Sequence, residues 1–530
     1  ASANGKINNN TTDSWVIDNI LNYKNTFGKH SIDLTAVATR DRKKYEMIET
    51  TGSNFAANGN TTLGINGLHK ATVQKVNMDN NQRSNIGYLG RASYSYDDRY
   101  FFTGSYRRDG ASVFGVNQKW GDFFAFGGAW RLSSEKFMSS ISYLDDLKLK
   151  VSWGKNGNQG LDPYGTLSTI NNGASGGVRY EFGGSDIIYG LNQKALGNAN
   201  LGWETTESWN TGFESAWLGS RLFVDLDLYF SKTTDQIFTR DIPVMTGFKN
   251  MKSSMGQVNN RGVELTIRSV NINTQDWYWT TNLTFWLNRN KLVHLYGEDL
   301  NGDGKEDDDI SNSRFIGKPL GAIYGYQQDG IVQETDIEYM KANGATPGIP
   351  KYKDMDNDGV ITSADRVILG YSTPNFKLNM SNTITYKNWD LYFMLTGTFG
   401  GGGYYQKSNK GAYLTNGSGR FNTNGIYIPW WTPENKSNEY PAATFNDDGG
   451  RFLGLQNRAF VRLQDVTLSY TFREPWVQKV NIQNLKVFFT AKNLFTITKW
   501  QGGDPEVGVT VSENTYPVLT SFSLGANISF

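Results

Sequence analysis

The last nine residues, which end at Phe530, alternate between apolar side chains and side chains that are small or polar. Residues 221–230 alternate in the same way, with leucine, valine and phenylalanine on one face and Asp225 and Asp227 on the other. A repeat of two residues is typical of a β-strand with one apolar face. Because two carboxylates on one face need water or partners, we expect the polar face of this strand to line a wet interior.

About fifteen segments read as strands of the length that is needed to cross a bilayer. They are expected to begin near Trp15, Ser31, Asn85, Tyr100, Phe123, Leu147, Glu207, Arg221, Asn260, Trp277, Phe376, Trp389, Phe460, Leu485 and Ser521. No run of about 18 apolar residues occurs, so the sequence predicts no transmembrane helix. The fold class that follows is all-β.

The gaps between these segments are alternately short and long. Short gaps include Gly28-Lys29, Asp97-Asp98 and Lys387-Asn388, whereas the longest gaps cover residues 294–375 and 400–459. Short turns at one end and long loops at the other indicate a transmembrane, up-and-down antiparallel β-barrel. In such barrels the short turns are periplasmic, so the two longest gaps are expected to be extracellular loops.

The same alternation orients the chain. The final strand follows a long gap, so Phe530 is expected in the periplasm, and counting back places Ala1 outside the cell in a loop remnant over residues 1–13. Bacterial single-chain barrels usually have an even number of strands, and an open edge in lipid leaves backbone groups unpaired. We therefore expect an upstream polypeptide to pair with the first strand.

Composition fits a barrel and excludes several other classes of protein. Mean hydropathy is -0.51 although 14% of the residues are aromatic, as expected of a wall that is apolar outside and polar inside. The net charge of +1 gives no reason to expect a nucleic-acid partner. There is no cysteine, and the three histidines (His30, His69 and His294) are too scattered for a zinc site or a catalytic triad. We expect no enzyme activity, since carboxylate pairs such as Asp225 and Asp227 are ordinary in a wet lumen.

Eight short motifs follow one another along the chain. They are YLGRASYSY (88–96), YRRDGAS (106–112), WGKNGN (153–158), WTPEN (431–435), VRL (461–463), TLSY (467–470), NLFT (493–496) and GDPE (503–506). Together with the closing strand, this ordered set resembles the SusC/RagA family of TonB-dependent transporters of the Gram-negative outer membrane.

The resemblance implies that the chain is the C-terminal half of a transporter with a 22-stranded barrel and a plug domain. About fifteen strands would lie here, and the plug, the remaining strands and the TonB-contacting segment would precede Ala1. It also implies uptake of oligosaccharides or peptides with a SusD-like surface lipoprotein as a lid. Two alternatives remain open: a TonB-dependent receptor for siderophores or cobalamin, and a passive porin without plug or lid.

An acidic loop within the gap 294–375 has the spacing of a calcium-binding loop. The candidate ligands are Asp354, Asp356, Asp358, the Val360 carbonyl, Thr362 and Asp365. Carboxylates two residues apart repel each other unless a cation lies between them, and Gly359 permits the sharp turn that such a loop needs. The sequence thus predicts a structural Ca²⁺ here; the alternative is a solvated acidic turn.

Weaker candidates lie in other loops. A second acidic loop offers Asp299, Asn301, Asp303, Lys305 and Asp307, but it places Ile310 where the last ligand should be. Four aromatic residues could stack on a sugar ring, although interfacial anchoring or loop packing is the favoured interpretation. These four are Tyr404, Tyr405, Trp430 and Trp431.

Overall fold

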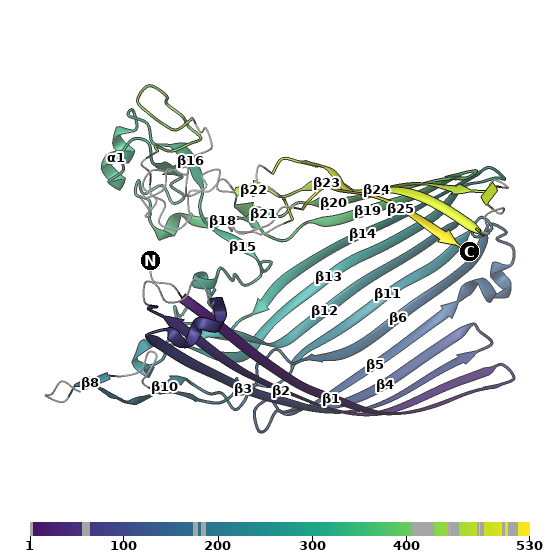
Figure 1. The fold of residues 1–530 in the computed structure, drawn as a ribbon, viewed down its shortest axis with the longest axis horizontal. Helices are drawn as coiled ribbons and strands as arrows, with labels where there is room; N and C mark the ends of the chain where they lie inside the picture. The colour runs from purple at the N-terminus through teal and green to yellow at the C-terminus, as the bar shows by residue number, and fades with distance from the viewer. Residues whose placement is uncertain are drawn as a thin grey trace.

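One antiparallel sheet of 15 strands dominates the computed structural model. The structure describes residues 4–55, 64–172, 179–181, 187–404, 429–443, 445, 455–473, 476–477, 482–500, 504–506 and 518–530. Figure 1 shows the sheet as a curved wall with long loops at one end and short turns at the other. We call these the long-loop end and the short-turn end.

The wall follows chain order, so each strand pairs with the next wall strand along the sequence. The strands are β1 (Asn4–Phe27), β2 (His30–Ser53), β3 (Val73–Tyr96), β4 (Tyr100–Ala111), β5 (Trp120–Arg131), β6 (Leu144–Asn158), β11 (Glu204–Trp217), β12 (Leu222–Asp241), β13 (Asn250–Asn273), β14 (Trp277–His294), β19 (Phe376–Tyr386), β20 (Trp389–Phe399), β23 (Phe460–Phe472), β24 (Asn484–Thr498) and β25 (Ser521–Ser529). All fifteen segments expected from the alternation are present, which confirms the up-and-down antiparallel topology.

The sheet has two edges, β1 and β25. β1 pairs with β2, and β25 pairs with β24. Within the described part of the chain neither edge strand has a second neighbour, so the wall does not close on itself. The N-terminal edge starts at the long-loop end and the C-terminus lies at the short-turn end (Figure 1).

Three strands begin earlier than the sequence predicted. β1 starts at Asn4, β3 at Val73 and β13 at Asn250, so the loop expected over residues 1–13 is wrong for residues 4–13. That stretch is rich in Asn and Thr and lacks an apolar face. It is a strand because β2 pairs with it along its whole length, and a complete ladder of backbone hydrogen bonds overrides weak β-propensity.

The strand β5 shows how the wall presents two different surfaces. Trp120, Phe124, Phe126 and Trp130 alternate along one face and are exposed by 45%, 41%, 57% and 37%. Asp122 and Gly128 share this face, and the residues that point to the other face up to residue 129 are glycine or alanine, apart from the buried Phe123. Ten residues of strand at about 3.3 Å each, tilted by about 40°, rise about 25 Å, which is the height of the apolar band of a membrane barrel.

Aromatic rings line the short-turn end of the wall. Neighbouring rings stack or tilt against each other at centroid distances of 4.4–6.5 Å in the pairs Tyr96–Tyr100, Tyr100–Trp130, Tyr143–Trp217, Trp277–Tyr386 and Trp389–Tyr470. Such amphipathic rings are favoured where lipid headgroups meet water. They mark one boundary of the apolar band.

The opposite face of the wall is polar. The Lys150 ammonium lies 2.8 Å from Asp225 and 2.9 Å from Asp227. Gly212 is the cross-strand neighbour of both Lys150 and Asp227, so the lysine side chain reaches the carboxylates across a residue without a side chain. The two carboxylates are 47% and 31% exposed, as expected of groups in a wet interior.

Smaller elements fill the connections. Five two-stranded sheets pair β7 (Thr169–Asn172) with β10 (Leu191–Ala195), β8 (Arg179–Glu181) with β9 (Ile187–Tyr189), β15 (Ala322–Tyr326) with β18 (Arg366–Tyr371), β16 (Gln328–Ile331) with β17 (Pro350–Tyr352), and β21 (Gly402–Tyr404) with β22 (Leu455–Asn457). The helices are α1 (Ile337–Asn343), η1 (Gly64–Lys70), η2 (Leu132–Ser134), η3 (Lys136–Met138), η5 (Val244–Thr246), η6 (Ile310–Asn312) and η7 (Ser363–Asp365). No described helix has the length and apolar character required to cross a membrane.

Two small apolar cores lie where the long loops pack onto the wall. One contains Ala111, Val113, Phe114, Leu161 and Leu201. The other contains Val258, Leu292 and Leu295. These cores fix the loops to the strand ends.

Candidate functional site

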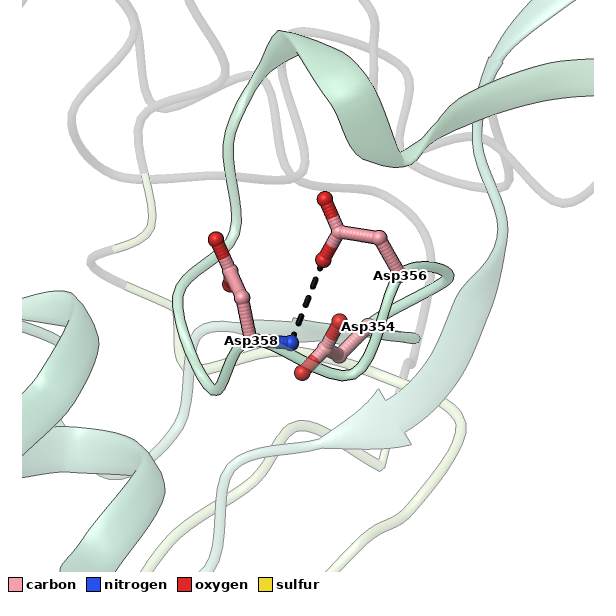
Figure 2. Close-up of side chains that lie close together, drawn as sticks. All are labelled: Asp354, Asp356 and Asp358. Atoms are coloured by element: carbon pink, nitrogen blue, oxygen red, sulfur yellow. Dashed lines mark hydrogen bonds between the residues drawn. The ribbon is translucent and has the colours of Figure 1, made fainter.

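The acidic loop between β17 and β18 is the sharpest site that the structure forms. Asp354, Asp356 and Asp358 each offer one carboxylate oxygen, and these oxygens lie within 4.8 Å of one another. Figure 2 shows the three side chains gathered around one turn of the chain. The sequence predicted all three as ligands of one cation, and the structure brings them together.

The backbone of this turn is held by the same carboxylates. Asp354 accepts hydrogen bonds from the N–H groups of Asn357 and Gly359 at 2.6 and 2.7 Å. Gly359 has a φ of +87°, which a residue with a side chain rarely adopts. The loop is therefore shaped by Asx-type turns, in which Asp356 and Asp358 also accept hydrogen bonds from the N–H groups of Asp358 and Val360.

The group fits a calcium ion. Ca²⁺ binds oxygen ligands at about 2.3–2.6 Å, so two ligands of one ion are at most about 5 Å apart. The N–H of Asp358 lowers the pKa of Asp356, but desolvation and the charges of Asp358 and Asp365 outweigh it and raise the pKa above its ordinary 3.8. A bound cation would relieve this repulsion.

Asp365, which the sequence predicts as the last ligand, holds the backbone of the loop. It is fully buried, and its two oxygens accept hydrogen bonds from Met355 N–H and Thr362 N–H, each at 2.7 Å. These two N–H groups lower its pKa below 3.8. Asp365 does not belong to the close three-carboxylate group but joins the two ends of the loop, in a capping box with Thr362. The spacing Thr-x-x-Asp is the sequence signal that could have shown this.

The second acidic loop adopts the same backbone pattern. Asp299 accepts from the N–H groups of Gly302 and Gly304 at 2.7 and 2.8 Å, as Asp354 does in the first loop. Asp307 accepts a hydrogen bond from Leu300 N–H at 2.6 Å, as Asp365 accepts one from Met355 N–H in the first loop. Asn301, Asp303 and Asp307 take part in hydrogen bonds within this loop, and no group of three close carboxylates forms here among the described residues.

The aromatic candidates do not form a stacking surface in the described structure. Trp431 is buried, donates its indole N–H to Gln333 at 2.9 Å and packs against Gly348. Trp430 is half-buried. Tyr405 and the side chain of Tyr404 lie outside the described residues. Trp431 thus joins segment 429–443 to the β16–β17 region, which is the loop-packing alternative.

A buried ion pair was missed from the sequence. Arg462 on β23 donates to Asp504 at 2.8 Å, and both side chains are only 5% exposed. Arg458 reinforces the contact by donating to the Pro505 carbonyl at 2.8 Å. The two residues of the pair stand in separate motifs, VRL and GDPE, and only their opposite charges could have suggested that these motifs meet.

A known protein family matches most of the chain. The model described as "TonB dependent receptor-like, beta-barrel" matches residues 1–494. The chain belongs to this family. TonB-dependent receptors of this kind are β-barrels of the outer membrane, and within the family the chain is SusC-like.

Individual relatives support the same family assignment. TonB-dependent receptor SusC of Bacteroides thetaiotaomicron is 30% identical over 87% of this chain and 45% of its own length. TonB-dependent receptor P3 of Formosa agariphila is 28% identical over 98% of this chain and 52% of its own length. The solved RagAB peptide transporter superposes with a TM-score of 0.80 over 99% of this chain and 56% of that one, at 22% identity. This TonB-dependent receptor barrel therefore spans about half the length of the curated relatives that it matches.

Proposed function

We propose that this chain forms the channel wall of a TonB-dependent importer of oligosaccharides or peptides, completed by upstream strands and a plug from the same transporter. The observation that carries the proposal is the likeness to SusC along 87% of the chain. The polar inner wall supports it, because a substrate rich in hydroxyl and amide groups needs hydrogen-bonding partners along its path.

The experiment is uptake by cells that carry the full-length protein. Deletion of its gene should abolish growth on one class of nutrient, a glycan or a peptide, within a panel offered as sole source. Loss of TonB or collapse of the proton gradient should have the same effect. Uptake that continues without TonB would contradict the proposal and favour a passive porin. Growth loss restricted to iron-siderophore or cobalamin media would favour the other receptor class.

We propose that a SusD-like surface lipoprotein is the partner that binds at the long-loop end. Residues 320–372 and 429–443 build a folded cap there from β15 to β18 and α1, which is a defined surface on which such a lid could rest (Figure 1). A tagged full-length transporter should retain a SusD-like lipoprotein during purification. In the proposed arrangement the long-loop end lies outside the cell and Phe530 lies in the periplasm. The role proposed for the chain needs no covalent chemistry.

We propose further that the loop of Asp354, Asp356 and Asp358 binds one structural Ca²⁺. The support is the 4.8 Å grouping of the carboxylates together with the ligand spacing. Ile361 N–H donates to Asn343 at the end of α1, so an ion that fixes the loop would also fix this helix. Terbium luminescence with the full-length protein should show one saturable site that calcium displaces. Asp356→Asn should weaken it, whereas Asp329→Asn, in the same cap, should leave it unchanged. Unchanged terbium binding in the Asp356→Asn variant would contradict the proposed calcium site.

A further inference from the structure

The outward face of β12, β13 and β14, opposite to the face that carries Asp225, changes from apolar to basic at one height. The three strands lie side by side in the wall (Figure 1). Three successive cross-strand rows on this face are wholly apolar: Val224–Ile267–Leu283, Leu226–Leu265–Phe285 and Leu228–Val263–Leu287. The next row toward the long-loop end contains Arg261 and Arg289, and the row beyond it contains Lys232 and Lys291. We call these four cations the basic cluster.

The basic cluster lies at the upper limit of the lipid-facing band. Arg289 is twelve positions beyond Trp277, which begins β14 and packs against Tyr386 in the aromatic row at the short-turn end. Twelve residues at about 3.3 Å each, tilted by about 40°, rise about 30 Å. The apolar band of a membrane barrel is about 25 Å tall. The four cations therefore lie at the level of the lipid headgroups, directly above side chains that face the acyl chains.

Carboxylates of the chain do not balance these charges. Within the described part of the chain, none of the four side chains forms an ion pair. The carboxylate of Glu207, the cross-strand partner of Lys232, accepts the indole N–H of Trp153 at 2.8 Å. Arg261 and Arg289 are themselves direct cross-strand partners, and like charges in that position repel each other. An anion bound between the two arginines would turn this repulsion into attraction.

The geometry leaves donors available for such an anion. Arg289 donates through Nη1 to the carbonyls of Asn288 and Asn375 at 2.9 and 2.6 Å, which holds its guanidinium in place. A guanidinium has five N–H donors and matches the paired oxygens of a phosphate. Arg261, Arg289 and Lys291 are exposed. A single basic side chain at this level is explained by its charge reaching for water, but that does not account for two arginines placed directly opposite each other.

We propose that the basic cluster binds the phosphate group of a lipid headgroup in the leaflet at the long-loop end. The acyl chains of the same lipid lie on the apolar rows below, so the partner is a phosphorylated lipid and not a free phosphate ion. The site is on the outer surface of the wall and goes beyond the proposed import function. Only the assignment of this leaflet to the cell exterior rests on that function.

The test is native mass spectrometry of the full-length protein in detergent, titrated with phosphorylated lipid A and with the same lipid A after removal of its phosphate. The phosphorylated lipid should bind more tightly. Arg261→Gln combined with Lys232→Gln should weaken its binding by roughly fivefold for each charge removed, or about 25-fold in all. The control is Lys377→Gln, which removes a cation from the inner face, in the row of Asp227. It should leave lipid binding unchanged.

Three results would overturn the inference. Equal affinity for the two forms of lipid A would exclude a phosphate site. Displacement of the lipid by inorganic phosphate alone would indicate a site for free anions. Full binding in the double variant, with its folded band intact in unheated electrophoresis, would place the lipid elsewhere on the wall. None of these results bears on nutrient uptake, so the growth experiment tests the proposed function separately.

Discussion

The guanidinium of Arg462 donates to the carboxylate of Asp504 at 2.8 Å, and this pair joins β23 to the connection between β24 and β25. Both side chains are 5% exposed, so neither charge has much water around it. The cross-strand partners of Arg462 are Thr396 and Thr496, on the same polar side of the wall. The pair therefore holds residues 504–506 against the inner face of the wall at its long-loop end.

Removing one member of this pair should be costly. Arg462→Met removes the ion-pair partner of the buried Asp504, and we expect a loss of about 3–5 kcal/mol of local stability. Arg462→Met combined with Asp504→Leu should recover much of this loss, since the pair is then replaced by apolar side chains. Hydrogen exchange over residues 504–506 would measure both effects. Equal exchange in the parent and Arg462→Met would contradict the role of the pair.

Gly212 should tolerate no side chain. A Cβ at this position would collide with the Leu226 carbonyl and would lie 3.0 Å from Asp227. Gly212→Ala is expected to destabilise the barrel by about 1–3 kcal/mol, the usual range for overpacking. The matched control is Gly90→Ala on β3, where a Cβ would have nothing within 4 Å. The temperature at which the folded band is lost in unheated-versus-heated electrophoresis should fall for the first variant and not for the second.

Trp431 should hold the cap together. Its ring is 8% exposed and its indole N–H bonds Gln333. Trp431→Ala should cost about 3–5 kcal/mol and release segment 429–443 from the β16–β17 region. Limited proteolysis of intact cells should then cut within this segment first. Leu300→Ala, at a position that is 83% exposed, serves as the control and should not change the cleavage pattern.

The cap should lose stability in acid through Asp336. The Lys351 ammonium, 2.8 Å away, lowers the pKa of Asp336 below 3.8, and Asp336 in turn raises the pKa of Lys351 above 10.5. A carboxyl with a lowered pKa in the folded state stabilises that state above its unfolded pKa, and the contribution is lost as the pH falls through the lowered value. Proteolysis of the cap after brief exposure to acid should therefore rise below about pH 4. Asp336→Asn should flatten this dependence, and an unchanged acid response in that variant would exclude the pair as its source.

The strand count could be predicted from sequence because the lipid and the lumen impose opposite chemistry on alternate residues. That signal weakens where strands leave the bilayer, which is why the starts of β1, β3 and β13 were placed too late. The Asp354 group was predictable because its members are close in sequence. The anchoring role of Asp365 and the meeting of Arg462 with Asp504 depend on tertiary contacts, and spacing along the chain does not reveal them.

We expect that β1 and β25 are edges of a larger membrane barrel and do not pair with each other. One distance tests it: the separation of spin labels at Leu21→Cys and Leu524→Cys in the full-length protein, both outward positions that are 72% and 79% exposed. The pair Leu21→Cys and Ala36→Cys, which are cross-strand neighbours, calibrates the short limit. If about seven strands separate the edges, eight spacings of about 4.8 Å place the labels roughly 30–40 Å apart. A separation as short as that of the calibrating pair would show that the two edges pair directly and would contradict the larger barrel.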